Sequence, residues 1–140
     1  MRLKCTACGL CMARCPKKIV VPAAFSDYGG TGFMMPKLDF SRGFCDPDCT
    51  VCGEACPSGA ISALSLVEKR AWRIGLAKWD ETKCLVCSEK VPCGLCARRC
   101  PHQAIALDKE KRPVVDAAKC VGCGACEHYC PTQALVIVGR

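Results

Sequence analysis

The sequence has few aliphatic and aromatic side chains for its size. Leu, Ile, Val and Phe make up only 30 of the 140 residues, and the aromatic residues account for 6%. The hydrophobic fraction of 51% includes 17 cysteines and therefore overstates the apolar side chains available for a core. Chains with roughly a fifth of such residues lie near the range in which proteins stay disordered. Something other than a large aliphatic core must fill the interior.

The sequence also lacks long apolar runs. None approaches the roughly 18 residues that a membrane-spanning helix needs, and no signal peptide or twin-arginine leader precedes Cys5. We therefore expect a cytoplasmic protein without a membrane span, in a compartment where thiols stay reduced. There, and with an odd number of cysteines, metal ligation is favoured over disulfide bonds.

Histidine is nearly absent. His102 and His128 are the two in the sequence, and each lies close to a Cys-Pro pair. They supply neither a Ser/His/Asp nor a Cys/His catalytic constellation. We expect no catalytic residues.

The cysteines form four blocks, which open 40, 39 and 36 residues apart. The blocks are Cys5, Cys8, Cys11 and Cys15; Cys45, Cys49, Cys52 and Cys56; Cys84, Cys87, Cys96 and Cys100; and Cys120, Cys123, Cys126 and Cys130. In every block the last cysteine follows the third after three residues and precedes a proline. Cys93, inside the long gap of the third block, is left over; we expect a free thiol, and an exchange with Cys96 is the alternative.

The similarity between blocks extends beyond the cysteines. A short turn and an apolar residue follow each Cys-Pro pair, and Asp80 and Asp116 precede the third and fourth blocks at the same spacing. The pattern predicts a repeated unit of strand, ligand loop, helical turn and strand.

Short strands are predicted over residues 104–107, 113–115 and 135–138. Residues 64–76 could hold a helix, and residues 25–40 are expected to form a surface or partner-docking loop. Trp79, before the third block, is expected to pack against the core.

The spacing within a block suits an iron–sulfur cluster. Cysteines three residues apart in a tight loop can bring thiolates to three irons of a [4Fe–4S] cluster, while backbone N–H groups between them point at the sulfurs. The proline after the fourth cysteine favours the start of a helical turn. That turn carries the fourth thiolate away from its own loop.

This arrangement resembles bacterial polyferredoxins and is similar in layout to four-cluster electron-transfer subunits of molybdenum and tungsten oxidoreductases. The resemblance implies an α+β fold of tandem two-[4Fe–4S] ferredoxin modules, with short strands and helical turns. It also implies four [4Fe–4S] clusters held by the sixteen block cysteines. The expected partners are a catalytic oxidoreductase subunit and a second electron carrier or flavin subunit in a hetero-oligomer. The sequence departs from the usual spacing of this family in two places. Three residues separate Cys45 from Cys49 in the second block, and eight separate Cys87 from Cys96 in the third.

Two pairings of the blocks are open. The gap from Cys100 to Cys120 is that of a simple ferredoxin and favours sequential pairing. Similarity to oxidoreductase subunits implies nested pairing, which we expect: the first and fourth blocks (residues 1–30 and 108–140) form one module, and the second and third (residues 31–107) form the other. The nested ligand sets are Cys5, Cys8, Cys11 and Cys130; Cys120, Cys123, Cys126 and Cys15; Cys45, Cys49, Cys52 and Cys100; and Cys84, Cys87, Cys96 and Cys56.

Other metal chemistries fit the pattern less well. Structural zinc sites combine short Cys pairs, often with His, separated by a finger. The first three cysteines of the second block match radical-SAM spacing, but that chemistry needs an iron without a protein ligand. Here Cys56 follows in register, and the chain has no room for a barrel around a substrate.

The formal charge of +7 invites a nucleic-acid interpretation. Each oxidised cluster with four thiolates carries about −2, so four clusters bring the net charge to about −1. Aromatic residues do not alternate with basic ones as in a base-stacking surface. We expect no nucleic-acid partner, and we expect a one-electron wire within an oxidoreductase complex. A free polyferredoxin shuttle and a redox-sensing or accessory module are the alternatives.

Overall fold

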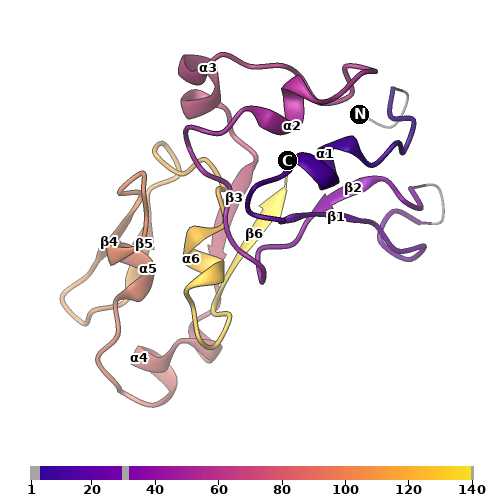
Figure 1. The fold of residues 1–140 in the computed structure, drawn as a ribbon. Coiled ribbons are helices and arrows are strands. Elements are labelled where there is room, and N and C mark those ends of the chain that lie inside the picture. The colour runs from indigo at the N-terminus through magenta and orange to yellow at the C-terminus, as the bar shows by residue number, and fades with distance from the viewer. Residues whose placement is uncertain (1–3, 30–31, 140) are drawn as a thin grey trace. The chain divides into compact units, whose positions relative to one another are not determined.

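The computed structural model describes residues 4–29 and 32–139. The chain divides into two compact units (Figure 1). Unit 1 comprises Met1–Gly43 and Asp48–Arg70, and unit 2 comprises Phe44–Pro47 and Ala71–Arg140. Short helices and two-stranded sheets make up the regular structure of the described ranges. This agrees with the α+β mixture of short strands and helical turns that the sequence predicts.

Unit 1 contains one antiparallel strand pair and three short helices. Strand β1 (Val20–Pro22) pairs with β2 (Pro36–Leu38). Helix α1 (Leu10–Arg14) packs against α2 (Val51–Glu54) and β1. Helix α3 (Leu66–Ala71) is the helix left open over residues 64–76. It begins with a capping box, because Ser65 and Glu68 each accept a backbone N–H from the other.

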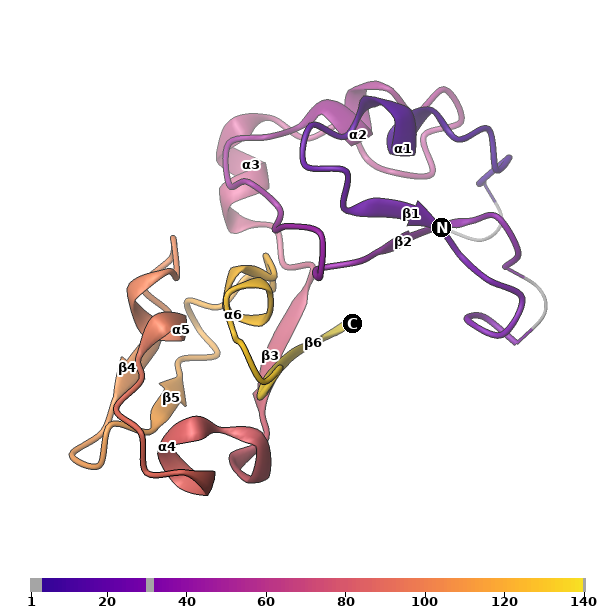
Figure 2. The same cartoon turned by 60° about the horizontal axis from the view of Figure 1, so that its bottom comes forward.

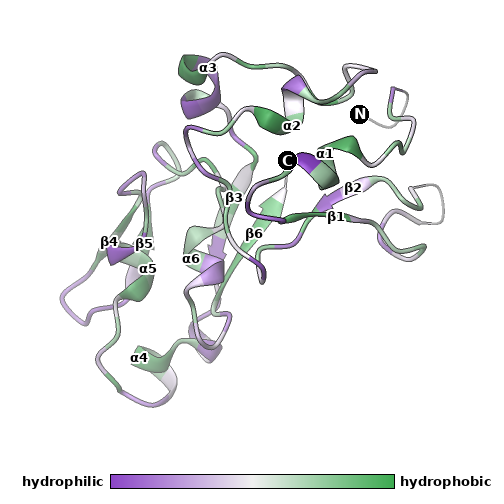
Figure 3. Cartoon of the chain, in the orientation of Figure 1, coloured by the Kyte–Doolittle hydropathy of each residue, from purple (hydrophilic) through white to green (hydrophobic). Residues whose placement is uncertain are grey.

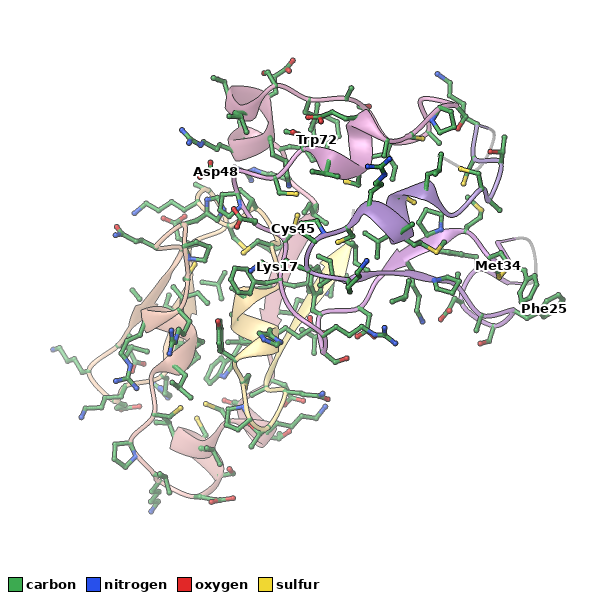
Figure 4. The ribbon with its side chains drawn as sticks, viewed as in Figure 1. Lys17, Phe25, Met34, Cys45, Asp48 and Trp72 are labelled. Atoms are coloured by element: carbon green, nitrogen blue, oxygen red, sulfur yellow. The ribbon has the colours of Figure 1, made fainter. Side chains whose placement is uncertain are left out.

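The range 25–40, predicted as a surface loop, is exposed at Phe25 and Phe33 but also contains strand β2 and the buried Met35 and Phe40. Phe25 and Phe33 are 68% and 60% exposed, and their ring centroids lie 6.5 Å apart. Figure 4 shows Phe25 and Met34 at the outer end of this segment. The buried side chains of unit 1 include Ile19, Val20, Met35, Phe40, Cys11 and Cys15.

Unit 2 contains two antiparallel strand pairs. Strand β3 (Gly75–Trp79) pairs with β6 (Leu135–Gly139), and β4 (Ile105–Leu107) pairs with β5 (Pro113–Val115) (Figure 2). The predicted strands over residues 104–107, 113–115 and 135–138 are confirmed. The remaining elements are η1 (Glu81–Lys83), α4 (Leu85–Ser88), α5 (Leu95–Arg98) and α6 (Ala125–His128).

The core of unit 2 is small and rich in cysteine. Its buried residues are Ala77, Ala104, Ile105, Leu135, Cys120 and Cys126. Trp79 packs against this cluster, as the sequence predicts. Figure 3 shows the apolar colour in short separate stretches and not in long continuous elements. The interior therefore forms around the cysteine loops.

The sequence repeat in unit 2 corresponds to a structural repeat. Asp80 donates its backbone N–H to the carbonyl of Ala134 at 2.8 Å, and Asp116 donates to the carbonyl of Ala104 at the same distance. Each alanine lies four residues after a Cys-Pro cysteine, and each aspartate precedes the other cysteine block. The third and fourth blocks are therefore joined in two equivalent places.

This organisation differs from the nested modules expected from the sequence. Strand β3 precedes the third block, and its partner β6 follows the fourth, so one sheet holds the two blocks in the same unit. Nested pairing would also have brought the ends near Met1 and Val138 together. In the structure Val138 pairs with Leu76, and Met1 lies outside the described residues.

In residues 4–29 and 32–139, no helix combines the length and the apolar character required to cross a bilayer.

Candidate cluster-binding sites

The four Cys-Pro pairs begin the same backbone turn. In each, the residue three positions after the cysteine has a positive φ and donates its N–H to the carbonyl of that cysteine. These residues are Lys18, Gly59, Gln103 and Gln133, with φ of 54°, 63°, 49° and 52° and N···O distances of 3.2, 3.3, 3.2 and 3.3 Å. Left-handed backbone is uncommon outside glycine, so its recurrence marks a required geometry. The first block shares this turn although its following segment is one residue shorter.

Three of these turns direct a second N–H onto the cysteine sulfur. The donors and acceptors are Ile61 and Cys56 Sγ at 3.5 Å, Ala104 and Cys100 Sγ at 3.3 Å, and Ala134 and Cys130 Sγ at 3.2 Å. The residue with positive φ reverses the chain direction, so that an N–H one or two residues further along reaches the sulfur. Such donors stabilise a thiolate, the form that binds iron.

Hydroxyl groups reinforce this effect in two blocks. Ser58 Oγ and Thr132 Oγ1 lie 3.7 Å from the sulfurs of Cys56 and Cys130. The N–H of Ile61 and the Ser58 hydroxyl lower the pKa of Cys56. Burial opposes ionisation of Cys130, but the Thr132 hydroxyl and neighbouring N–H groups outweigh it, so its pKa is also lowered.

A first cavity of unit 2, cavity A, is lined by thiols from the third and fourth blocks. Its walls include Cys84, Cys93, Cys96, Cys130 and Trp79. Burial raises the pKa of Cys96 to about 11, and electrostatic interactions with the other three cysteines raise it further. These four sulfurs therefore surround one space.

Cys87 lies beside cavity A on helix α4. Its N–H donates to the carbonyl of Cys84 at 2.8 Å, and burial and the neighbouring Cys84 raise its pKa. The expected ligands Cys84, Cys87 and Cys96 of the third block are thus close together.

A second cavity, cavity B, is lined by Cys100, Cys120, Cys123 and Cys126. Burial raises the pKa of Cys126 to about 12, and the three other cysteines are the charged groups that raise it further. Burial also raises the pKa of Cys123. A metal that binds these buried sulfurs would have to displace their protons.

Each cavity combines cysteines of one block with the Cys-Pro cysteine of the other. Cys130 of the fourth block joins Cys84 and Cys96, and Cys100 of the third block joins the fourth-block set. The nested sets instead placed Cys130 with the first block and Cys100 with the second. The β3–β6 sheet holds the third and fourth blocks in one unit, where the Cys-Pro cysteine of each lines the cavity of the other.

In unit 1 the first block gathers around α1. Cys11 is buried on this helix, which raises its pKa, and Cys5 and Cys8 are its charged neighbours. Cys49, Cys52 and Cys56 belong to the same unit, and α1 packs on α2, which carries Cys52.

Cys45, the first cysteine of the second block, lies in unit 2. Its N–H donates to the carbonyl of Cys123 at 2.8 Å. Figure 4 labels Cys45 on the segment that links it to the rest of the second block.

An aromatic cluster lies beside the last turn of α6. The rings of His128 and Tyr129 are 4.9 Å apart, and Phe44 contacts both at 6.2 and 5.8 Å. The Arg99 guanidinium lies 4.9 Å from the centroid of the Tyr129 ring. The cluster packs over the chain that enters Cys130.

Trp79 has a second structural feature that the sequence did not indicate. It lines cavity A, and its indole Nε1 is buried without a hydrogen-bond partner among the described residues. An orphan donor of this kind is rare in folded proteins. A group bound in cavity A would supply the hydrogen-bond acceptor that the Trp79 Nε1–H lacks.

The donor set of both cavities fits [4Fe–4S] clusters. Each cavity offers four thiols, and the Cys-Pro sulfur of each receives a backbone N–H. In the described part of the chain, no three His, Cys, Asp or Glu side chains are grouped to hold a single metal ion.

Residues 91–134 match the family model of the 4Fe-4S dicluster domain. The chain is 36% identical over 129 residues to the methylamine utilization ferredoxin-type protein MauM of Methylophilus methylotrophus, covering 84% of this chain and 55% of that protein. It is 31% identical over 126 residues to the beta subunit of NADH-dependent phenylglyoxylate dehydrogenase from Aromatoleum evansii, covering 85% of this chain and 25% of that subunit. The chain thus spans about half the length of the MauM proteins that it matches.

Among solved structures, a chain of the formate dehydrogenase–heterodisulfide reductase–formylmethanofuran dehydrogenase complex from Methanospirillum hungatei is similar, at 22% identity and a TM-score of 0.37. The match covers 98% of this chain and 53% of that chain, and so low a TM-score does not establish a common fold. Over residues 91–134 the chain thus matches a domain that holds two [4Fe–4S] clusters, and its curated relatives include ferredoxin-type proteins.

Proposed function

We propose that the chain is an electron-transfer subunit in which four [4Fe–4S] clusters form a wire between a catalytic redox subunit and another electron carrier. The observation that carries this proposal is the pair of thiol-lined cavities in unit 2, each completed by the Cys-Pro cysteine of the other block. The Cys-Pro turns of unit 1 have the same backbone geometry as those of unit 2, so we propose that unit 1 also holds two clusters. The ligands are the sixteen block cysteines.

The chain's own residues prepare these sites. The amides of Ala104 and Ala134 and the Thr132 hydroxyl stabilise the thiolates of Cys100 and Cys130. The β3–β6 sheet holds the two loops in one unit, and the buried Ala134 and Ala104 line cavities A and B. A bound [4Fe–4S] cluster supplies a one-electron redox couple. We propose no catalytic residue.

The partners follow from the number of clusters. Two clusters suffice for a diffusible carrier, whereas four suit a conduit between distant redox sites. One relative is the beta subunit of a dehydrogenase, which supports a place in a hetero-oligomer. We propose a catalytic oxidoreductase subunit, of the molybdenum or tungsten type, at one end. A second carrier or a flavin subunit takes the other end.

A free polyferredoxin shuttle is the second candidate, because three relatives are named as ferredoxin-type proteins and not as subunits. A redox-sensing or accessory module is the third. Analytical sizing of the native extract separates the first two, since a wire subunit co-purifies with a dehydrogenase and a shuttle runs alone. Clusters that fail to cycle in a redox titration would favour the sensor.

The test of the cofactor is an anaerobic iron and sulfide assay, combined with electron paramagnetic resonance (EPR) of the reduced protein. We expect four cluster equivalents with interacting signals. Colourless, iron-poor protein that is still folded would overturn the proposal.

Paired substitutions test the ligand sets. Cys100→Ser together with Cys126→Ser should remove one cluster, because both line cavity B. Nested sets predict the loss of two. Cys126→Ser together with Cys130→Ser is the matched control and should remove two clusters, because these cysteines line different cavities.

A further inference from the structure

Cys93 occupies the position that the second cysteine takes in two other blocks. In those blocks the second cysteine is followed by a glycine with positive φ, and this glycine caps a short helix that carries the third cysteine. The matching segments are Cys8, Gly9 and α1 with Cys11; Cys123, Gly124 and α6 with Cys126; and Cys93, Gly94 and α5 with Cys96. The φ angles of these glycines are 78°, 86° and 148°. By local structure, Cys93 is therefore a second cysteine.

Cys87 fills the same place by sequence order alone. It lies on α4, a separate short helix that begins one residue after Cys84. The third block thus contains two candidates for one ligand position. The other blocks have one cysteine there.

The cavity itself includes Cys93. Its wall contains the thiols of Cys84, Cys93, Cys96 and Cys130, while Cys87 lies beside Cys84. The unpartnered indole N–H of Trp79 belongs to the same cavity and independently marks it as the place of a bound acceptor. Five thiols therefore lie in or beside cavity A, whereas a [4Fe–4S] cluster needs four ligands.

We propose that Cys93 is an alternative ligand of the cavity A cluster and exchanges with Cys87 at the second ligand position. This inference rests on the proposed function. In the exchange the Cys93 thiol gives its proton to solvent and bonds to iron as a thiolate. The Cys87 thiolate leaves that iron and takes up a proton, so that no electron is gained or lost. The remaining ligands Cys84, Cys96 and Cys130 stay in place.

The test uses the full chain, reconstituted anaerobically with iron and sulfide. The variants are Cys87→Ser, Cys93→Ser and the double variant. Each single variant should keep the iron, sulfide and EPR signal of every cluster, and the double variant should lose one cluster equivalent. The matched control is Cys8→Ser, the second position of the first block, which has no fifth cysteine. This control should lose one cluster.

Thiol alkylation of the loaded protein, mapped by mass spectrometry, gives a readout that does not depend on total iron. In the Cys87→Ser variant Cys93 should be protected, and in the Cys93→Ser variant Cys87 should be protected. Loss of a cluster from either single variant, or alkylation of Cys93 in Cys87→Ser, overturns the exchange. Iron-free wild-type protein would overturn the proposed function instead, so the two failures are distinguishable.

Discussion

Gly122 and Gly75 are in backbone-to-backbone contact. A Cβ atom on Gly122 would lie 2.6 Å from the carbonyl oxygen of Gly75, closer than real Cβ atoms approach other groups. Gly122 also has a φ of +71°. Gly75 opens strand β3, and a Cβ atom on it would lie 2.5 Å from the carbonyl oxygen of Val138 in β6. The ligand loop of the fourth block is therefore held directly against the sheet that unites the third and fourth blocks.

Replacing Gly122 by alanine should destabilise unit 2. The positive φ costs about 1–3 kcal/mol for a residue with a side chain, and the contact with Gly75 adds a steric cost that backbone atoms cannot relieve cheaply. Thermal unfolding of the anaerobic, cluster-loaded protein measures the loss. Gly9→Ala is the matched control, since Gly9 has a φ of +78° but open space around its Cβ position. Equal losses in the two variants would show that the contact with Gly75 is unimportant.

The local structure could be predicted from the sequence because it repeats. Residues 104–107 and 135–138 were predicted as strands from short apolar runs after Cys-Pro turns, and the structure confirms them. The pairing of β3 with β6 could not be predicted in this way. A strand partner depends on contacts between distant segments, and the repeat makes every block locally similar to every other. The choice between sequential and nested pairing was therefore open.

Replacing Thr132 by valine should lower the reduction potential of the cavity A cluster. The Thr132 hydroxyl lies 3.7 Å from Cys130 Sγ and favours its negative form. A difference of about 1 kcal/mol between redox states corresponds to roughly 40 mV for a one-electron couple, so we expect a shift of at most a few tens of millivolts. An EPR-monitored redox titration measures it.

The control for Thr132 lies in unit 1. Ser58→Ala removes the equivalent hydroxyl beside Cys56 and should shift a different cluster signal. Ser41→Ala removes a hydroxyl bonded to the carboxylate of Asp39 and should shift neither. If Thr132→Val left all potentials unchanged, the hydroxyl would have no effect on the cluster.

Replacing Trp79 by phenylalanine should also lower the potential of the cavity A cluster. The change keeps an aromatic ring for packing and removes the buried, unpartnered Nε1–H. Hydrogen bonds to the sulfurs of a cluster raise its potential because they stabilise the more negative, reduced state. The redox titration described for Thr132 measures the shift, which we expect to be tens of millivolts. Trp72→Phe is the matched control, since Trp72 is 51% exposed and lines neither cavity.

Much of the candidate site could be predicted from cysteine spacing, but its hydrogen bonds could not. The interval from Cys100 to Cys120 favoured the observed sharing of cysteines between the third and fourth blocks, but the similarity to oxidoreductase subunits led to the nested prediction. The donor role of the Ala104 amide depends on the left-handed Gln103, and nothing in a Pro-His-Gln-Ala segment indicates that conformation. Cys93 was set aside because, in the place of Cys96, it would be separated from Cys100 by six residues and break the three-residue spacing that precedes each Cys-Pro pair. Its neighbour Gly94 was the signal that linked it to the second cysteines of the other blocks.

Removing the metal should unfold the protein. The largest fully buried side chains in the described ranges are Ile19 and Leu135, and cysteines such as Cys11, Cys123 and Cys126 supply much of the remaining interior. A domain is stabilised by only about 5–15 kcal/mol in total, and without clusters the cavities lose their contents and bury protonated thiols without ligands. We expect iron chelation under anaerobic conditions to abolish the far-ultraviolet circular dichroism of the native state, and iron with sulfide to restore it. A native-like spectrum in iron-free protein would show that the aliphatic side chains suffice to hold the fold, and that the clusters are cargo and not core.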